Sequence, residues 1–132
     1  MGGGGPSGGG PSGGGPSGGG PPVAAPTSPL GASLLEPALL VLIQEQPRHG
    51  YSLLNDLEAL GLRGLHPSMV YRALREMEAL GWIASDWDTA QTQGPPRKTY
   101  RLDRDGEAAL RNWRQELERT GSLIAALLNR IR

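Results

Sequence analysis

Apolar side chains recur every three or four residues, the spacing of one helix face, in three segments between residues 36 and 81. The segment 36–46 is apolar around nearly its whole circumference, which indicates a helix that is buried on more than one side. The segment from about 51 to 60 carries its leucines on one face and is followed by Gly61, and the segment from Pro67 to Gly81 carries a single apolar stripe. We therefore expect three short helices separated by glycine and proline turns.

Beyond the third helix the pattern changes to that of two strands. Two runs of alternating polarity, 82–87 and 98–102, predict these strands. The segment between them is polar and contains Gly94-Pro95-Pro96, which predicts a β-hairpin with a long polar tip. Ile83 and Trp87 of the first strand are expected on one face, and Tyr100 and Leu102 of the second strand are expected to face inward.

A long helix is predicted over 104–131, where apolar residues recur alternately three and four positions apart. Such heptad spacing is typical of helices that pair along a seam. Gly121 lowers the helix propensity by about 1 kcal/mol relative to alanine, so we expect a kink or break beside it. The seam consists of Leu110, Trp113, Leu117, Thr120, Ile124, Leu127 and Ile131.

Together these elements predict a mainly α fold with a two-stranded β wing. We expect a winged helix-turn-helix domain over 33–103, followed by a C-terminal dimerisation helix over 104–132. Because a subunit of about a hundred residues cannot cover both an all-apolar first helix and a heptad seam, we expect a two-fold homodimer. The candidate dimerisation residues, which the second subunit would cover, are Leu39, Leu42, Leu110, Trp113, Leu117, Ile124 and Leu127.

The N-terminal segment differs sharply in composition from the rest of the chain. Residues 1–33 contain no Asp, Glu, Lys or Arg, but hold 14 of the 21 glycines and 7 of the 12 prolines, largely as a repeated Gly-Gly-Gly-Pro-Ser unit. Such a segment cannot bury enough apolar surface to offset the entropy of ordering it. We expect residues 1–32 to form a disordered tether, with a partner-binding segment as the alternative.

Composition and motifs exclude several classes of function. The chain has no Cys, which rules out disulfides, zinc–thiolate sites and thiol nucleophiles. His49 and His66 lack partners spaced for metal coordination, and no nucleophile–base set or phosphate-binding glycine loop is found. We expect neither an enzyme nor a cofactor nor a metal site. Since the sequence offers no signal peptide and no apolar run near the ~20 residues of a membrane helix, we expect a cytoplasmic protein.

The net charge is zero, but the basic residues are unevenly distributed. Residues 63–104 hold seven of the 13 Lys and Arg residues. Polar and basic side chains on a helix and on an adjoining wing can bind the phosphates and base edges of duplex DNA. The alternative interpretation of each such residue is an ordinary side chain in contact with solvent. The candidate DNA contacts are Ser68, Tyr71, Arg72 and Arg75 on the third helix and Arg97 and Lys98 on the wing.

Several motifs in this order resemble the PadR family of bacterial transcription regulators. They are His49-Gly50-Tyr51, the run from Ser68 to Leu74, the run from Glu78 to Ile83, and the run from Gly94 to Leu102 with Gly106 after it. The resemblance extends from residue 34 to about 113. It implies a homodimer whose first and last helices pack between subunits, and DNA binding by the third helix and the wing. The glycine-rich tether has no counterpart in the family pattern.

Two further features resemble a subgroup of polyhydroxybutyrate-responsive repressors, namely Trp87-Asp88-Thr89 before the wing and Trp113 in the last helix. Trp113 has two interpretations. It is either a core residue, or a flat aromatic side chain that lines a pocket for a small-molecule or polymer effector.

The function that these observations favour is a sequence-specific DNA-binding transcription regulator, a repressor, that acts as a homodimer. The third helix would lie in the major groove and the wing on the DNA backbone. The alternative is a winged-helix module that contacts only other proteins, and the zero net charge is the best evidence for it. Salt-dependent binding to duplex DNA distinguishes the two, because counterion release accompanies only the first.

Overall fold

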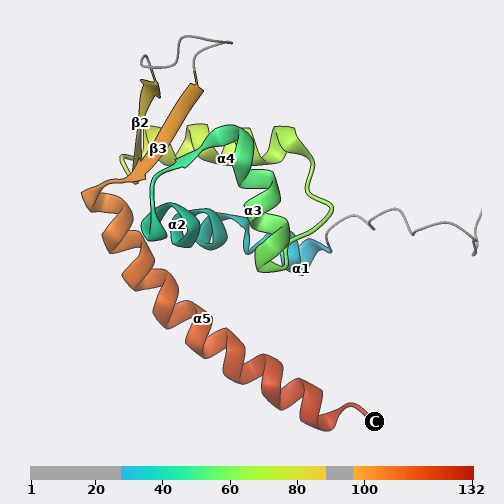
Figure 1. Ribbon diagram of the computed structural model, residues 1–132. Helices are drawn as coiled ribbons and strands as arrows, with labels where there is room; N and C mark the ends of the chain where they lie inside the picture. Colours follow the sequence, from blue (N-terminus) through green and yellow to red (C-terminus); the bar gives the residue numbers. More distant parts are fainter. Residues whose placement is uncertain (1–27, 89–96) are drawn as a thin grey trace, which may run out of the picture.

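The computed structural model describes residues 28–88 and 97–132 of the chain. Helices α2, α3 and α4 lie beside a small sheet, and α5 runs away from them to the C-terminus (Figure 1). The mainly α winged-helix architecture is confirmed, and the predicted elements begin and end within two residues of their expected bounds. The polar hairpin tip and residues 1–27 of the tether lie outside the described residues. The elements are α1 (Pro29–Ala32), α2 (Leu35–Glu45), β1 (Arg48–His49), the 3₁₀ turn η1 (Gly50–Ser52), α3 (Leu53–Leu60), α4 (Pro67–Ala79), β2 (Ile83–Asp88), β3 (Arg97–Leu102) and α5 (Arg104–Arg130).

Helix α2 lies at the centre of the hydrophobic core. It contacts α3, α4, β3 and α5, so other parts of the same chain cover its apolar circumference. Leu39 and Leu42 are both buried in the single chain, which corrects the expectation that a second subunit covers them. The wing strand and the start of α5 fold back over the helix and take that place. The other buried side chains of the core include Leu53, Leu57, Val70, Leu74, Met77, Ile83 and Tyr100.

A one-turn helix, α1, lies within the segment that composition predicts to be disordered. The Oγ of Ser28 accepts a hydrogen bond from the backbone N–H of Gly31 at 3.1 Å, and Pro29 occupies the first turn, where its missing N–H costs nothing. This N-cap is a local signal inside an uncharged stretch. The regular structure therefore begins before the boundary expected at residue 33.

The sheet contains three antiparallel strands in the order β1-β3-β2, one strand more than the sequence predicts. The additional strand, β1, pairs Arg48 with Tyr100 and His49 with Thr99. Two residues are too few to show an alternation of polarity, so this strand has no signal in the sequence. It forms because β3 offers it an unpaired edge.

The hairpin strands β2 and β3 extend from the core into solvent. Ile83 pairs with Leu102 at the core end, and Trp87 pairs with Lys98 further out. Residues two or four apart in a strand share a face, so Ile83 and Trp87 do lie on one face, as expected. Only Ile83 reaches the core, however, at 1% exposure, while Trp87 is 61% exposed.

Helix α5 is continuous from Arg104 to Arg130, so the kink expected beside Gly121 is absent. A single glycine costs only about 1 kcal/mol relative to alanine, which the helical residues on both sides of Gly121 outweigh. The second half of α5 is exposed in the single chain, and so is its apolar seam. The exposed apolar residues there are Leu117, Leu123, Ile124, Leu127, Leu128 and Ile131.

The first turn of α5 approaches the backbone of the wing very closely at Gly106. A Cβ at this position would lie 2.0 Å from the carbonyl oxygen of Trp82, whereas a Cβ at Gly121 would meet nothing within 4 Å. We expect Gly106→Ala to lower the free energy of unfolding by about 3 kcal/mol through overpacking. The matched change Gly121→Ala should raise it by about 1 kcal/mol, because alanine has the higher helix propensity. Urea unfolding of both variants measures these opposite changes in the free energy of unfolding. If the two variants are equally stable, the close packing of α5 on the wing is contradicted.

Candidate nucleic-acid interface

Helix α4 presents a polar face to solvent opposite its buried stripe. Ser68, Arg72 and Arg75 are exposed on this face. The guanidinium of Arg72 lies 3.6 Å from the carboxylate of Glu76, but its side chain is 76% exposed, so this ion pair holds it only weakly. Within the described part of the chain, the guanidinium of Arg75 makes no hydrogen bond or ion pair. These two arginines can therefore reach an external partner.

Ser68 and His66 form the start of α4. The Nδ1 atom of His66 accepts a hydrogen bond from the backbone N–H of Ser68 at 3.2 Å and lies 2.8 Å from the Ser68 hydroxyl. His66 is therefore the N-cap of the helix, a structural role, and Pro67 follows it at the first helical position. Within residues 28–88 and 97–132, no group of three His, Asp or Glu side chains is placed to hold a metal ion.

The two basic residues predicted on the wing have different surroundings. The exposed Arg97 donates a hydrogen bond to the Tyr51 hydroxyl at 3.0 Å, and its guanidinium carbon lies 4.8 Å from the centre of the Tyr51 ring. Lys98 is half-buried, and its Nζ lies 3.3 Å from a carboxylate oxygen of Glu78 on α4. Arg97 thus stays exposed while it contacts Tyr51, whereas Lys98 is paired with a carboxylate of α4.

A hollow of about 460 Å³ lies between the Gly50–Ser52 turn, Tyr71 of α4 and the wing. Gly50 forms part of it, and a Cβ there would lie 3.2 Å from the Tyr100 ring and 3.5 Å from the Tyr71 ring. The absent side chain lets the two tyrosines close over the turn. Burial raises the pKa of the Tyr100 phenol above its usual value, and the nearby ammonium of Lys98 partly opposes this shift. The hollow is lined by Gly50, Tyr51, Tyr71, Trp87, Arg97, Lys98 and Tyr100.

Sequence reasoning had not placed Tyr51 and Trp87 at this surface. Tyr51 belongs to the His49-Gly50-Tyr51 motif, and Trp87, which is expected to share a strand face with Ile83, is exposed. The motif was the only available signal for Tyr51, because its contact with Arg97 joins residues 46 positions apart. The structure brings Tyr71, Arg97 and Lys98 together around the hollow and leaves Arg72 and Arg75 beside it on α4.

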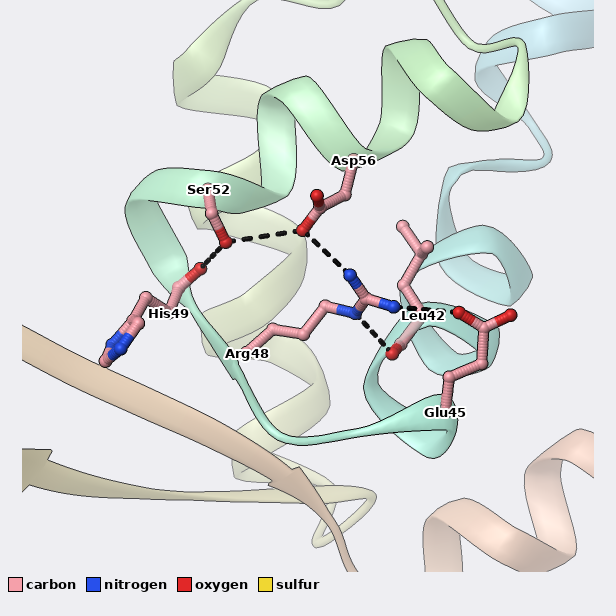
Figure 2. A network of polar contacts seen from close by, with 6 residues as sticks. All are labelled: Leu42, Glu45, Arg48, His49, Ser52 and Asp56. Carbon is pink, nitrogen blue, oxygen red and sulfur yellow. Dashed lines mark hydrogen bonds and ion pairs between the residues drawn. The ribbon is translucent and has the colours of Figure 1, made fainter.

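A partly buried arginine network holds the Gly50–Tyr51 turn in place (Figure 2). The Nε atom of Arg48 donates to the carbonyl oxygen of Leu42 at 2.6 Å, at the end of α2. Its terminal nitrogens lie 2.8 Å from the carboxylate of Glu45 and 3.2 Å from that of Asp56 on α3. Ser52 completes the network by donating to the carbonyl oxygen of His49 at 3.0 Å. Arg48 thus ties the segment after α2 to both neighbouring helices.

His49 continues this arrangement toward the wing. Its Nδ1 lies 3.2 Å from the Thr99 hydroxyl of β3, and its ring stacks on that of Tyr51 with 5.3 Å between centroids. Arg97 of the wing lies over the same Tyr51 ring. Side-chain contacts of His49 and Tyr51 therefore connect the turn to the wing. His49 is a structural residue of this joint.

The sequence-predicted dimerisation residues are divided between the core and the surface. Leu39 and Leu42 are core residues, as described above. Leu110 and Trp113 are half-buried against the core. The remaining three, Leu117, Ile124 and Leu127, are exposed along α5.

The family model of PadR-like transcriptional regulators matches residues 39–112, which is more than half of the chain and includes α3, α4 and the wing. This chain belongs to the PadR-like family of transcriptional regulators. Regulators of this family bind DNA and are not enzymes. The match ends in the first part of α5, so most of the exposed apolar seam lies beyond it.

Solved structures have the same fold. The chain is 27% identical to a PadR family transcriptional regulator from Eggerthella lenta, with a TM-score of 0.66, and the match covers 77% of this chain and 88% of that one. It is 33% identical to a conserved protein of unknown function, described as a potential transcriptional factor, over 78% of this chain and 91% of that one, with a TM-score of 0.66. A PadR-like transcriptional regulator from Bacillus cereus, 24% identical, shares the fold over 76% of this chain and 97% of that one, with a TM-score of 0.68.

No curated protein matches the chain. None of these comparisons supports the narrower resemblance to polyhydroxybutyrate-responsive repressors. Among the described residues, no helix of this PadR-like regulator is long and apolar enough to cross a membrane.

Replacing Arg48 should destabilise the fold of this PadR-like regulator. Its side chain is only 14% exposed and serves three acceptors, so Arg48→Met leaves a carbonyl and two carboxylates short of a donor. We expect the free energy of unfolding to fall by about 2 kcal/mol. The control Arg72→Met removes an exposed ion pair and should cost at most about 0.5 kcal/mol. Urea unfolding of the two variants tests this. If both variants lose the same free energy of unfolding, the Arg48 network contributes no more than an exposed ion pair.

Proposed function

We propose that this PadR-like regulator represses transcription in the cytoplasm by binding duplex DNA in a sequence-specific manner as a homodimer. The observation that carries the proposal is the continuous surface formed by the outer face of α4 and the wing. Arg72 and Arg75 are exposed on α4, and Tyr71 and Arg97 both line the neighbouring hollow. Helix α4 would enter the major groove, and the wing would lie on the backbone.

The residues of this surface suit different parts of DNA. Arg72 and Arg75 on the helix would reach base edges as well as phosphates, because guanidinium groups form bidentate contacts with guanine. The Ser68 and Tyr71 hydroxyls can donate to phosphate without carrying charge. Arg97 and Lys98 extend the surface onto the wing, and the sequence-neutral phosphate contact there would come from Arg97.

Dimerisation would use the exposed half of α5. A groove of about 690 Å³ lies between α2 and α5, and its lining includes Val41, Leu110, Trp113 and Leu117. The Trp113 indole N–H donates to the carboxylate of Glu36 at 2.9 Å, which holds α5 against α2. Each chain thus offers both a groove and an exposed apolar helix end. In a two-fold dimer, α5 of one subunit would pack into the groove of the other.

A two-fold dimer also explains how the protein would select an operator. Two copies of α4 about 34 Å apart would face successive major grooves, so the preferred site would be an inverted repeat. An effector is a further hypothesis, and so is the polyhydroxybutyrate-responsive subgroup that Trp113 suggests. Because the Trp113 N–H is already paired with Glu36, an effector in the groove would meet the ring face of Trp113 and not its donor.

A winged-helix module that contacts only proteins is the second candidate function. The zero net charge and the exposed aromatic rings of Tyr51 and Trp87 favour it. Binding to duplex DNA that weakens linearly with the logarithm of salt concentration would exclude it, because that dependence reports the release of counterions from phosphates.

Substitutions on the helix and on the wing should affect DNA binding differently. We expect Arg75→Ala to weaken binding to the specific site by about 1–3 kcal/mol and to relax the preference at one base position. Arg97→Ala should weaken binding to specific and random duplexes alike and reduce the salt slope by about one unit for each phosphate that is no longer neutralised. Fluorescence anisotropy over a salt series, on an operator selected from random duplexes, measures both effects.

The control for these variants is Arg119→Ala, which removes an exposed arginine of α5 paired with Glu116, far along the chain from α4 and the wing. It should leave affinity and salt slope unchanged. If Arg75→Ala and Arg97→Ala behave like this control, the DNA-binding surface lies elsewhere on the protein.

Charged residues on the exposed seam of α5 should prevent dimerisation. We expect the double substitution Leu117→Glu and Ile124→Glu to give a folded monomer in sedimentation velocity, because a carboxylate would have to be buried in the interface. Leu60→Glu, at an exposed leucine that ends α3, is the matched control and should sediment like the wild type. A wild-type chain that is already monomeric at micromolar concentration would contradict the dimer.

A further inference from the structure

Glu78 joins helix α4 to both strands of the wing. It lies near the end of α4, and one carboxylate oxygen is 3.3 Å from the Nζ atom of Lys98 on β3. Its other carboxylate oxygen accepts a hydrogen bond from the Ser85 hydroxyl on β2. The side chains of Glu78 and Lys98 are 33% and 32% exposed, so solvent screens this pair less than the fully exposed pairs elsewhere on the surface.

The ammonium group of Lys98 is also held by aromatic rings. It lies 5.8 Å from the centre of the Trp87 ring and 5.5 Å from the centre of the Tyr100 ring, both within the range of cation–π attraction. Trp87 is the cross-strand partner of Lys98, and Tyr100 lies two residues further along the same face of β3. One carboxylate and two ring faces therefore hold the charge of Lys98 inside the angle between α4 and the wing.

We propose that Glu78 is a positioning residue for DNA binding: its ion pair with Lys98 fixes the wing against α4, and Lys98 acts through this pair without contacting phosphate. The inference rests on the proposed DNA-binding function and deepens it. Helix and wing must meet one duplex at the same time, so the angle between them decides whether Arg97 reaches a phosphate while α4 lies in the groove. Glu78 is the one residue among those described whose carboxylate bonds to both β2 and β3.

A phosphate contact by Lys98 has a different signature. A lysine that neutralises a phosphate releases counterions, so its removal lowers the salt slope by about one unit per contact. A lysine neutralised by Glu78 releases none, so its removal lowers affinity at every salt concentration and leaves the slope unchanged. The direction of the affinity change at Glu78 also distinguishes the two roles. If the Glu78 carboxylate only repelled DNA, its removal would tighten binding, whereas removal of a positioning residue weakens it.

The test compares Lys98→Met, Glu78→Gln, the double variant with both changes, and the charge swap Glu78→Lys with Lys98→Glu. Each full-length protein is titrated with operator duplex over a salt series, after its unfolding midpoint has established that it is folded. We expect each single variant to bind about threefold or more weakly with an unchanged slope. The double variant should be no weaker than either single variant, because both remove the same interaction. The swap should recover only part of the affinity, because the Trp87 and Tyr100 rings do not attract a carboxylate at position 98.

A matched control exists on the other face of the wing. Arg101 of β3 pairs with Asp86 of β2 at 3.2 Å, and this ion pair involves no residue of α4. Arg101→Met should leave DNA affinity unchanged. An effect seen only in the Glu78 and Lys98 variants then comes from the lost link to α4, and not from the loss of an ion pair of the wing in general.

The possible failures are distinguishable from one another. A salt slope that falls by about one unit in Lys98→Met, or tighter binding by Glu78→Gln, would overturn the positioning role while leaving the proposed function intact. If the swap protein does not fold, the single and double variants still test the proposal. Their salt slopes are compared with the wild type, and the affinity of the double variant is compared with those of the single variants. A wild-type protein that binds no duplex in a salt-dependent manner would overturn the proposed function, and this inference with it.

Discussion

The burial of α2 is the constraint on which the rest of this structure depends. A helix that is apolar around its circumference is stable only if most of its surface is buried. Here α3, α4, β3 and the start of α5 cover α2, and Val41 remains half-buried beside the groove. The two ends of α2 then carry the polar contacts that orient the functional parts. Glu36 near its start binds the indole of Trp113 on α5, and the carbonyl of Leu42 near its end binds Arg48. One short helix thus sets the geometry between α5 and the turn beside the wing.

From that helix, a chain of specific contacts leads to the candidate DNA surface. Arg48 fixes the turn that contains Gly50 and Tyr51, Tyr51 lies against Arg97, and Glu78 binds Lys98. These contacts include ion pairs, a stacked ring pair and hydrogen bonds, and the Glu78–Lys98 pair joins the wing to α4 directly. The protein can therefore present a hairpin only two strands wide, which would be marginally stable alone, at a defined angle to α4.

The zero net charge of the chain is compatible with a basic surface, because many cations are neutralised locally. Arg48, Lys98 and Arg101 each pair with carboxylates of neighbouring elements. The arginines that face solvent on α4 are held weakly or by no partner among the described residues. What matters for binding phosphate is the charge left exposed on one face, and a total over the whole sequence does not measure it.

The sequence by itself determined the helices α2 to α5, the two hairpin strands, their bounds to within two residues and the family of the protein, but not the one-turn helix α1. These features depend on local signals such as apolar spacing, capping residues and glycine stops, which act over a few residues. Only the tertiary structure decided that Leu39 and Leu42 are covered by their own chain, that Arg48 and His49 add a third strand, and that Lys98 is paired with Glu78. Such outcomes depend on which residues, 20 or 50 positions apart, come within a few ångströms of each other. Periodicity reveals which face of an element is buried, but it does not reveal which partner buries it.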